Sequence, residues 1–418
     1  MEKNYTSDFF RISNIIIFNS LGFFFLDFLV PFIAVELFQS TGTEMGLLFS
    51  LRIIGYFISS SFVGWLSDVY NKKNMIIIGS TGRGLAYFIM YASIISTNLP
   101  ALMISNLLLG FMAGFFWIPF DALIAEKSIK EKRSHAYGIR TSAQGKGTFI
   151  GAFVGFTLLI SFEPNVPLMY IAIPIFGLSN LYASWRLFNE ITDEKITSEK
   201  NFAEKTNSSN GISKPMVLGI IALLFVIFLE ATNSSIAKPY IIPYFIDNFT
   251  NDITLASAIY IPAGVVSIVL APRMGNYLDR MNNYVAISIA SLLGASITYL
   301  LITTNSISIF AVLLTIDELI VMSVSLLLSN IFSRISIKHR GKLIGFRTFF
   351  TNLGGIIGPL TGGVLWEMYS EKTPFIVSIG IELLLIPFFI IAFFLITPYF
   401  EEKIDKKKQN ILPVEFDL

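Results

Sequence analysis

Long apolar stretches alternate with short polar segments along the whole chain. Each stretch is long enough to cross roughly 30 Å of hydrocarbon as a helix. Six expected spans lie in the first half: Ser13–Leu37, Glu44–Leu66, Asn74–Ser96, Ala101–Ala125, Thr141–Ser161 and Pro167–Leu187. Six more lie in the second half: Met216–Tyr244, Thr254–Met274, Tyr284–Thr303, Ser306–Phe332, Gly345–Tyr369 and Phe375–Thr397. The pattern predicts an all-α membrane protein with twelve transmembrane helices.

Composition agrees with a chain whose solvent is lipid. Of its 418 residues, 54% are hydrophobic and 14% are charged, and the mean hydropathy is +0.67. A soluble protein of this length cannot bury so much apolar surface. With no cysteine and two histidines, disulfides and thiolate metal sites are excluded, and we expect no metal and no cofactor. The net charge of +1 gives no indication of nucleic-acid binding.

One polar region divides the chain. Residues 189–214 are rich in Glu, Lys, Asn and Ser and lack apolar periodicity, which is typical of a solvated linker. We therefore predict a six-helix bundle over 1–188, a cytoplasmic linker over 189–214, a second six-helix bundle over 215–398 and a cytoplasmic tail over 399–418.

The basic residues predict the orientation. Lysines and arginines gather in the loops on one side of the membrane, whereas the other side carries essentially Lys372 alone. Both termini are therefore expected in the cytoplasm of a multi-pass protein of the cell membrane. Exterior loops such as Gln39–Thr43 leave no room for a catalytic or receptor domain. We expect a monomer that is not an enzyme.

Two unlike motifs are repeated in the same order. The segment Tyr137–Thr141 recurs as Ile344–Thr348, and Gly64–Asp68 recurs as Gly275–Asp279. Glycines in one register follow the first repeat in both copies: Gly147, Gly151, Gly155 and Gly354, Gly358, Gly362. The duplication predicts two pseudo-symmetric bundles that rock around a shared site. The glycine stripes allow a neighbouring helix to approach and slide, or serve packing alone.

The loop Gly64–Lys73 resembles the cytoplasmic signature of the major facilitator superfamily, and its echo Gly275–Arg280 keeps an Asp-Arg pair. Val69 and Asn71 depart from the family's usual basic residue and glycine. The resemblance covers essentially the whole chain and implies a secondary transporter. The second glycine series, with Pro359, matches the spacing of the family's antiporter motif, although it lies on the eleventh helix; on the fifth, where the motif is diagnostic, Ala152 replaces the proline.

Proton-coupled drug exporters of this family usually carry an arginine four residues before a glycine on the fourth helix. Here Asn106 precedes Gly110. If this protein moves protons, that arginine does not take part.

Charged residues within the spans are the candidates for a transport site, because each needs a partner or a watery cavity. Asp27 and Arg52 lie at similar depth on the first two helices and can form a pair, either functional or static. The seventh helix carries Glu230 and Lys238, which can bind a substrate charge or pair with each other as a structural contact.

The tenth helix carries a second group of candidates. Asp317 and Glu318 are adjacent there, so at least one is expected to face the interior. The candidates for proton coupling are therefore Asp27, Glu230 and Asp317, followed by Glu318. Glu382 on the twelfth helix is interpreted as structural. Arg83, Lys146 and Asp121 are expected to form a local network whose partners the sequence does not assign.

A cytoplasmic gate is the third hypothesis. Asp68 is expected near the start of the eleventh helix and Arg347, and Asp279 near the start of the fifth helix and Arg140. Such latches hold the cytoplasmic side shut and break when it opens. The expected gate residues are Asp68, Lys72, Lys73, Arg140, Asp279, Arg280 and Arg347.

The predicted function is alternating-access transport of a small organic solute, with proton-coupled efflux of amphipathic or drug-like compounds as the leading hypothesis. The antiporter-like glycine spacing and the intramembrane acids favour it. An importer of a sugar, carboxylate or peptide is the alternative, because Arg52 and Lys238 also suit an anionic substrate. A polytopic membrane enzyme and a transport-dead sensor are more remote, since the loops supply no catalytic cluster and the chain has no large soluble domain.

Overall fold

The structure is a computed structural model that describes residues 4–129, 132–194, 214–278, 281–333 and 340–399. Regular structure in these ranges is helical apart from an isolated antiparallel bridge between Tyr5 and Ser128. All twelve predicted spans lie on helices. Within the described residues, ten helical segments are long and apolar enough to cross a membrane, and Ile253–Val266 forms a shorter apolar helix.

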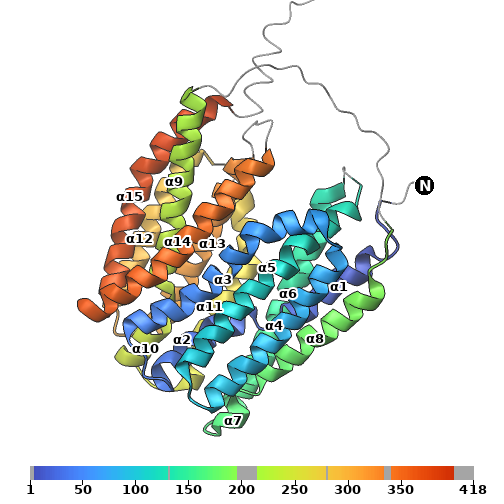
Figure 1. The fold of residues 1–418 in the computed structure, drawn as a ribbon. Helices are drawn as coiled ribbons and strands as arrows, with labels where there is room; N and C mark the ends of the chain where they lie inside the picture. The colour runs from blue at the N-terminus through green and yellow to red at the C-terminus, as the bar shows by residue number, and fades with distance from the viewer. Residues whose placement is uncertain (1–3, 130–131, 195–213, 279–280, 334–339, 400–418) are drawn as a thin grey trace, which may run out of the picture. The chain divides into compact units, whose positions relative to one another are not determined.

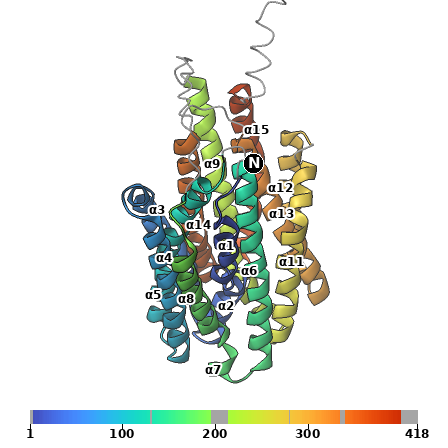
Figure 2. The same cartoon turned by 90° about the vertical axis from the view of Figure 1, so that its right-hand side faces the viewer.

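The first half of the chain contains eight helices in the described residues (Figure 1). They are α1 (Phe9–Asn19), α2 (Phe23–Glu36), α3 (Gly42–Val69), α4 (Lys72–Ile95), α5 (Leu99–Glu126), α6 (Arg133–Ser161), α7 (Val166–Met169) and α8 (Ala172–Glu190). The first predicted span is therefore two helices, with a break at Ser20–Gly22. The short α7 lies at the end of α6, before α8 (Figure 2).

The second half contains six long helices and the short α10 in the described residues. They are α9 (Lys214–Ile236), α10 (Ile241–Asn248), α11 (Ile253–Leu278), α12 (Asn283–Thr303), α13 (Ile307–Ser333), α14 (Arg340–Met368) and α15 (Thr373–Ile396). The seventh predicted span is also broken: the 3-10 turn Lys238–Tyr240 separates α9 from α10. Prolines at 239 and 243 explain this break, because each lacks the amide donor that a continuous helix needs.

The chain groups into two compact units. Unit 1 contains Met1–Lys205, Pro239–Ile261 and Gly362–Met368, and unit 2 contains Thr206–Lys238, Pro262–Thr361 and Tyr369–Leu418. Unit 1 thus includes the whole of α10 and the last turns of α14 in addition to the first six spans. The division at 189–214 into two six-helix bundles remains a prediction.

Side-chain caps define where the spans of unit 1 begin. Thr41 and Glu44 form a reciprocal capping box at the start of α3, and Asn71 and Asn98 cap α4 and α5. These caps satisfy amide donors that a helix end leaves without partners. Within unit 1, α5 packs against α3 and α4, and α4 packs against α8 (Figure 1). Within unit 2, α15 packs against α9 and α12.

Candidate functional site

The break between α1 and α2 is held by a buried arginine. Arg83 of α4 is 1% exposed, and it donates to the side-chain oxygen of Asn19 at 2.8 Å and to the Asn19 carbonyl at 2.9 Å. A carbonyl at a helix break inside a membrane needs such a donor, because lipid supplies none. The Phe18 carbonyl receives a hydrogen bond from Ser179 at 2.8 Å. Arg83 is thus assigned to the break and not to Asp121.

The first glycine series packs against the same break. A Cβ at Gly147 or Gly151 would overlap the backbone carbonyls of Ile17 and Leu21, and a Cβ at Gly155 would overlap the ring of Phe25. The bare face of α6 therefore lets its backbone contact α1 and α2 directly.

In unit 2, Gly354 and Gly358 of α14 stand in the same relation to α9. A Cβ at Gly354 would approach the Phe228 carbonyl to 2.7 Å, and one at Gly358 would approach Ser235 to 2.8 Å. Gly362 belongs to the end of α14 that groups with unit 1.

Asp27 and Arg52 form the predicted ion pair in unit 1. An Nη2 of Arg52 on α3 lies 2.6 Å from an Oδ1 of Asp27 on α2, and the side chains are 31% and 26% exposed. Gly110 lets α5 pack closely against α3 at Arg52, because a Cβ at this glycine would overlap the Arg52 carbonyl. This glycine is the one that Asn106 precedes in place of the family's arginine.

Aromatic rings line α2 beside this pair. Phe24 stacks on Tyr260 with ring centroids 5.0 Å apart, and Phe28 lies 5.4 Å from the same ring. Phe28 also meets Phe156 of α6 edge-on at 5.0 Å. The residues around Asp27 therefore combine a charge pair with apolar ring faces.

Arg140, predicted as a gate residue, pairs with Asp121 in unit 1. Its Nε lies 3.1 Å from Oδ1 of Asp121, it donates to Gln144, and its guanidinium lies 4.3 Å from the ring centre of Trp117. Sequence reasoning placed Asp121 in a network without a named partner. The register of α5 and α6, which the sequence does not state, brings it to Arg140.

Two acids of unit 2, Glu382 and Asp317, have polar neutral partners. Glu382 on α15 accepts a hydrogen bond from the Asn233 amide of α9, and Asn233 accepts one from Ser378 at 2.9 Å. Asp317 on α13 is 3.5 Å from the hydroxyl of Thr298 on α12. A Cβ at Gly294 would lie only 3.0 Å from the Glu382 carboxylate, so the glycine makes room for it.

Glu382 is a residue whose surroundings the sequence interpretation did not anticipate. Its carboxylate lies within electrostatic range of both Asp317 and Glu230, so it belongs with the intramembrane acids and not apart from them. Glu230 also faces the guanidinium of Arg347, and Glu318 is next to Asp317. The signal in the sequence was the presence of the charged Glu382 in an otherwise apolar span. Lys238 lies in the turn between α9 and α10.

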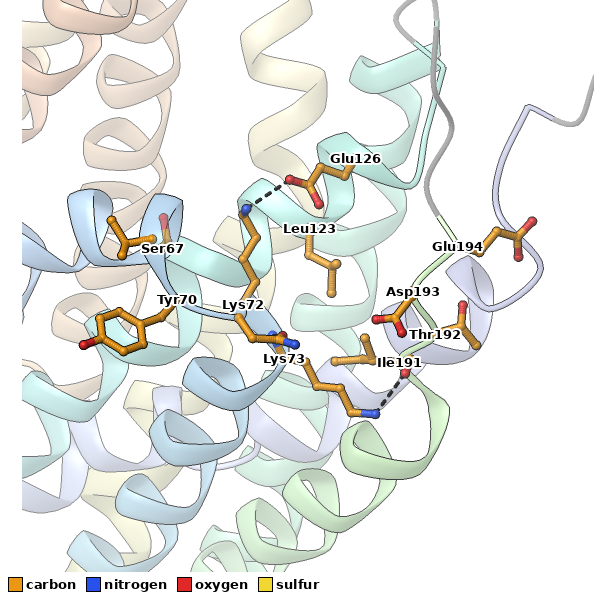
Figure 3. Close-up of a pocket in the computed structure, with 12 residues that line it drawn as sticks. Ser67, Tyr70, Lys72, Lys73, Leu123, Glu126, Ile191, Thr192, Asp193 and Glu194 are labelled. Carbon is orange, nitrogen blue, oxygen red and sulfur yellow. Dashed lines mark hydrogen bonds and ion pairs between the residues drawn. The ribbon is translucent and has the colours of Figure 1, made fainter.

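Two predicted gate lysines lie at the end of unit 1 that is expected to be cytoplasmic (Figure 3). Lys72 pairs with Glu126 at 3.0 Å, and Lys73 donates to the Ile191 carbonyl at 3.1 Å. They line a cavity of about 330 Å³ with the first residues after α8. Asp279 and Arg280 lie outside the described residues, as does the side chain of Asp68.

A fully buried ion pair lies close to this cavity. The Nζ of Lys127 is 2.7 Å from Oδ2 of Asp8, and both side chains are 0% exposed. Lys127 also donates to the carbonyls of Thr192 and Glu194 at 3.0 Å each, so it joins the N-terminal segment to the chain after α8. No pattern in the sequence indicates this pair, because Asp8 and Lys127 lie outside the spans and far apart.

The pKa of Asp8 reflects its partners. Burial alone raises the pKa of this carboxyl, but the hydrogen bonds from Lys127, Thr192 and Thr6 together lower it below its ordinary value of 3.8. Asp8 is therefore ionised at neutral pH.

Comparison with known proteins gives one family. A family model described as Major Facilitator Superfamily matches residues 12–315 and 223–415. The multidrug resistance protein MdtG of Escherichia coli is 25% identical over 352 residues, covering 81% of each chain. Multidrug resistance protein 2 of Bacillus subtilis is 23% identical over 342 residues, covering 80% of this chain and 82% of its own.

Solved structures share the fold. A bacterial homologue of the human lysosomal transporter Spinster, in an inward-facing and unoccupied conformation, has a TM-score of 0.73 at 10% identity and covers 96% of this chain and 99% of its own. The nucleoside transporter NupG has a TM-score of 0.68 at 14% identity and covers 92% of this chain and 98% of its own.

Proposed function

The chain belongs to the Major Facilitator Superfamily, and from this premise we propose that it exports amphipathic organic compounds in exchange for protons. As a member of that family it is a multi-pass membrane transporter of small molecules and not an enzyme. The names of MdtG and multidrug resistance protein 2 support the direction and the compound class. Alternating access of the two predicted bundles supplies the transport cycle.

The partners of Asp317 and Glu382 support the coupling to protons, and this is the observation that carries the proposal. Each carboxylate takes its hydrogen bond from a neutral group, Thr298 and Asn233 respectively. Protonation of such an acid strands no buried base, whereas protonation of an acid in an ion pair leaves its lysine or arginine uncompensated. Glu230 and Glu318 extend the same group, with Arg347 as the neighbouring base of Glu230.

Asp27 and Arg52 are proposed to contact the compound that is carried. The pair is partly exposed, and the stacked rings of Phe24 and Tyr260 lie next to it. Apolar ring faces with a few fixed charges suit an amphipathic ligand. Lys238 stays a candidate for a substrate charge.

The cytoplasmic gate belongs to the same proposal. Asp68 and Asp279 are proposed to latch the starts of the eleventh and fifth helices, which requires that Arg140 leave Asp121 for part of the cycle. Asp68→Asn should then slow turnover in proteoliposomes while leaving ligand affinity unchanged. Equal turnover would remove Asp68 from the gate.

Inverted membrane vesicles test the function. With an inward-acidic gradient they should accumulate a fluorescent amphipathic cation such as ethidium, and nigericin should abolish the accumulation. Asp317→Asn should remove the dependence on the proton gradient. Uptake of a sugar, carboxylate or peptide that does not respond to the gradient would favour the importer instead.

A further inference from the structure

Trp117 and Asp121 present an aromatic face and a carboxylate on one side of α5. The two residues are four apart, so they share a face of the helix. Arg140 of α6 covers both: its guanidinium lies 4.3 Å from the Trp117 ring centre, and its Nε lies 3.1 Å from Oδ1 of Asp121. A ring face and a carboxylate are the two groups that recognise an organic cation.

The contact between Arg140 and Asp121 is an ion pair without hydrogen-bond geometry between the two atoms that meet. The Arg140 Nε and the Asp121 Oδ1 are both buried, and neither has a hydrogen-bond partner, although they meet at ion-pair distance. By contrast, Arg83 donates two hydrogen bonds to Asn19 at 2.8 and 2.9 Å. Arg140 is therefore held by charge, by the ring and by its hydrogen bond to Gln144, and the first two attractions are available to another cation.

The position is open on the side of Asp121 and rigid behind Trp117. The Asp121 side chain is 42% exposed, whereas that of Arg140 is 15% exposed. Phe116 meets Trp117 edge-on at 4.7 Å, and Phe23 lies 5.9 Å away, so the ring is fixed by its neighbours. An incoming cation can thus reach the carboxylate first and then take the place of the guanidinium on the ring.

We propose that Trp117 and Asp121 form a binding site for monovalent organic cations, which Arg140 occupies as an internal cation when no ligand is bound. This inference rests on the proposed function and deepens it, because it names a site and the charge of the compounds that it takes. A cation that replaces Arg140 neutralises Asp121 and stacks on Trp117. Arg140 then acts as a competitor and not as a contact of the ligand.

Binding to the purified full-length protein tests the site, with tetraphenylphosphonium as the probe in equilibrium dialysis. We expect Arg140→Gln to lower the Kd by about tenfold, because the ring and the carboxylate lose their internal occupant. Asp121→Asn and Trp117→Leu should each raise the Kd by about tenfold. In Arg140→Ala, added guanidinium ion should compete with the probe far more strongly than it does in the wild type.

Arg186→Gln is the matched control. Arg186 lies over the ring of Tyr182 at 5.9 Å and pairs with Glu190 at 3.1 Å, so it combines the same three groups on the exposed surface of α8. Its removal should leave the Kd unchanged. Thermal stability and gel filtration of each variant show that a change in Kd is not a failure to fold.

The two proposals fail separately. If vesicles show proton-driven export but Arg140→Gln and Trp117→Leu leave the Kd unchanged, the site is overturned while the proposed function stands. Absence of probe binding in Arg140→Gln also overturns it. If vesicles show no export but probe binding follows the three substitutions as stated, the cation site stands and the function is overturned.

Discussion

Acids in the two compact units have different kinds of partner. In unit 1, Asp8, Asp27 and Asp121 each lie within 3.1 Å of a lysine or arginine nitrogen. In unit 2, Asp317 and Glu382 take hydrogen bonds from a threonine hydroxyl and an asparagine amide. Asp317 and Glu382 thus have neutral partners where the three acids of unit 1 have charged ones, whereas Glu230 of unit 2 faces Arg347.

This difference separates two roles of an intramembrane carboxylate. An acid with a basic partner cannot change its charge without exposing that partner to the cost of an uncompensated buried charge. An acid with a neutral partner can bind or release a proton while its hydrogen bond is kept or reversed. We therefore propose that the paired acids of unit 1 recognise a fixed charge and that Asp317 and Glu382 of unit 2 change their charge during the cycle.

The largest expected effect is on the buried pair of unit 1. Lys127→Met should lower the free energy of unfolding by about 3–5 kcal/mol, because it leaves the Asp8 carboxylate buried without its base. Glu382→Gln in unit 2 keeps an acceptor for Asn233 and should cost less than about 1 kcal/mol. Denaturation in mixed micelles measures both. Equal losses of unfolding free energy in the two variants would show that charged and neutral partners of the acids contribute equally to stability.

The glycine series offer the next comparison. Gly151→Ala places a methyl group into the Leu21 carbonyl and should cost about 1–3 kcal/mol. Gly354→Ala should cost less, because its Cβ would stand 2.7 Å from the Phe228 carbonyl, a smaller overlap. Gly145, with nothing within 4 Å of its Cβ position, is the control. A larger loss of unfolding free energy in Gly354→Ala than in Gly151→Ala would contradict this prediction and show that α14 packs more tightly on α9 than α6 packs on the first two helices.

The fold could be predicted from the sequence because each span carries its own signal. Every apolar stretch from Ser13–Leu37 to Phe375–Thr397 coincides with one helix or with two consecutive helices, because length and hydrophobicity are strong signals of a membrane span. The break at Ser20–Gly22 was not predicted. At the break the Asn19 carbonyl accepts a hydrogen bond from the distant Arg83, and a second one goes to the Asn19 side chain.

Ion pairs of the candidate site could be predicted only where two opposite charges lie at the same depth in the membrane on adjacent spans. Asp27 and Arg52 were paired correctly from their positions along adjacent spans. Arg140 and Asp121 were not, because their meeting depends on how α6 is rotated against α5. Glu382 was interpreted as structural, and the sequence did not place it near Asp317 and Glu230. Its distance from them depends on helix packing, and spans that are apolar on every face do not indicate which face packs against which helix.

Asp27→Asn should mainly lower stability, whereas Asp317→Asn should mainly lower proton-driven export. Asp27→Asn strands Arg52 but in a partly exposed position, so we expect a loss of about 1–2 kcal/mol, below that of Lys127→Met. Asp317→Asn keeps an acceptor for Thr298 and should change stability by less than about 0.5 kcal/mol. Proton-driven export should nevertheless fall at least about tenfold in Asp317→Asn.

The comparison of Asp27→Asn with Asp317→Asn needs both measurements on the same preparations. Counterflow of the substrate without a proton gradient should persist in Asp317→Asn, since alternating access itself does not require the proton. If Asp317→Asn loses stability but keeps proton-driven export, the acids of unit 2 are structural and the difference between the units has no role in coupling.

The smallest effect is the dependence of stability on pH, which is confined to the acid range. The pKa of Asp8 in the folded protein lies below its ordinary value of 3.8, so the unfolded chain binds the proton more tightly. The stability that Asp8 contributes is therefore fully present above the unfolded pKa and is lost as pH falls through the folded pKa. The difference in unfolding free energy between the wild type and Asp8→Asn should be constant from about pH 7 to 5 and shrink below about pH 4. Thr192→Val removes one hydroxyl donor to Asp8 and should raise the folded pKa toward the ordinary value of 3.8. The decrease should then be smaller, while its onset, which the unfolded chain sets, stays unchanged. A difference that stays constant into the acid range would mean that the Asp8–Lys127 pair does not set the acid sensitivity of unit 1.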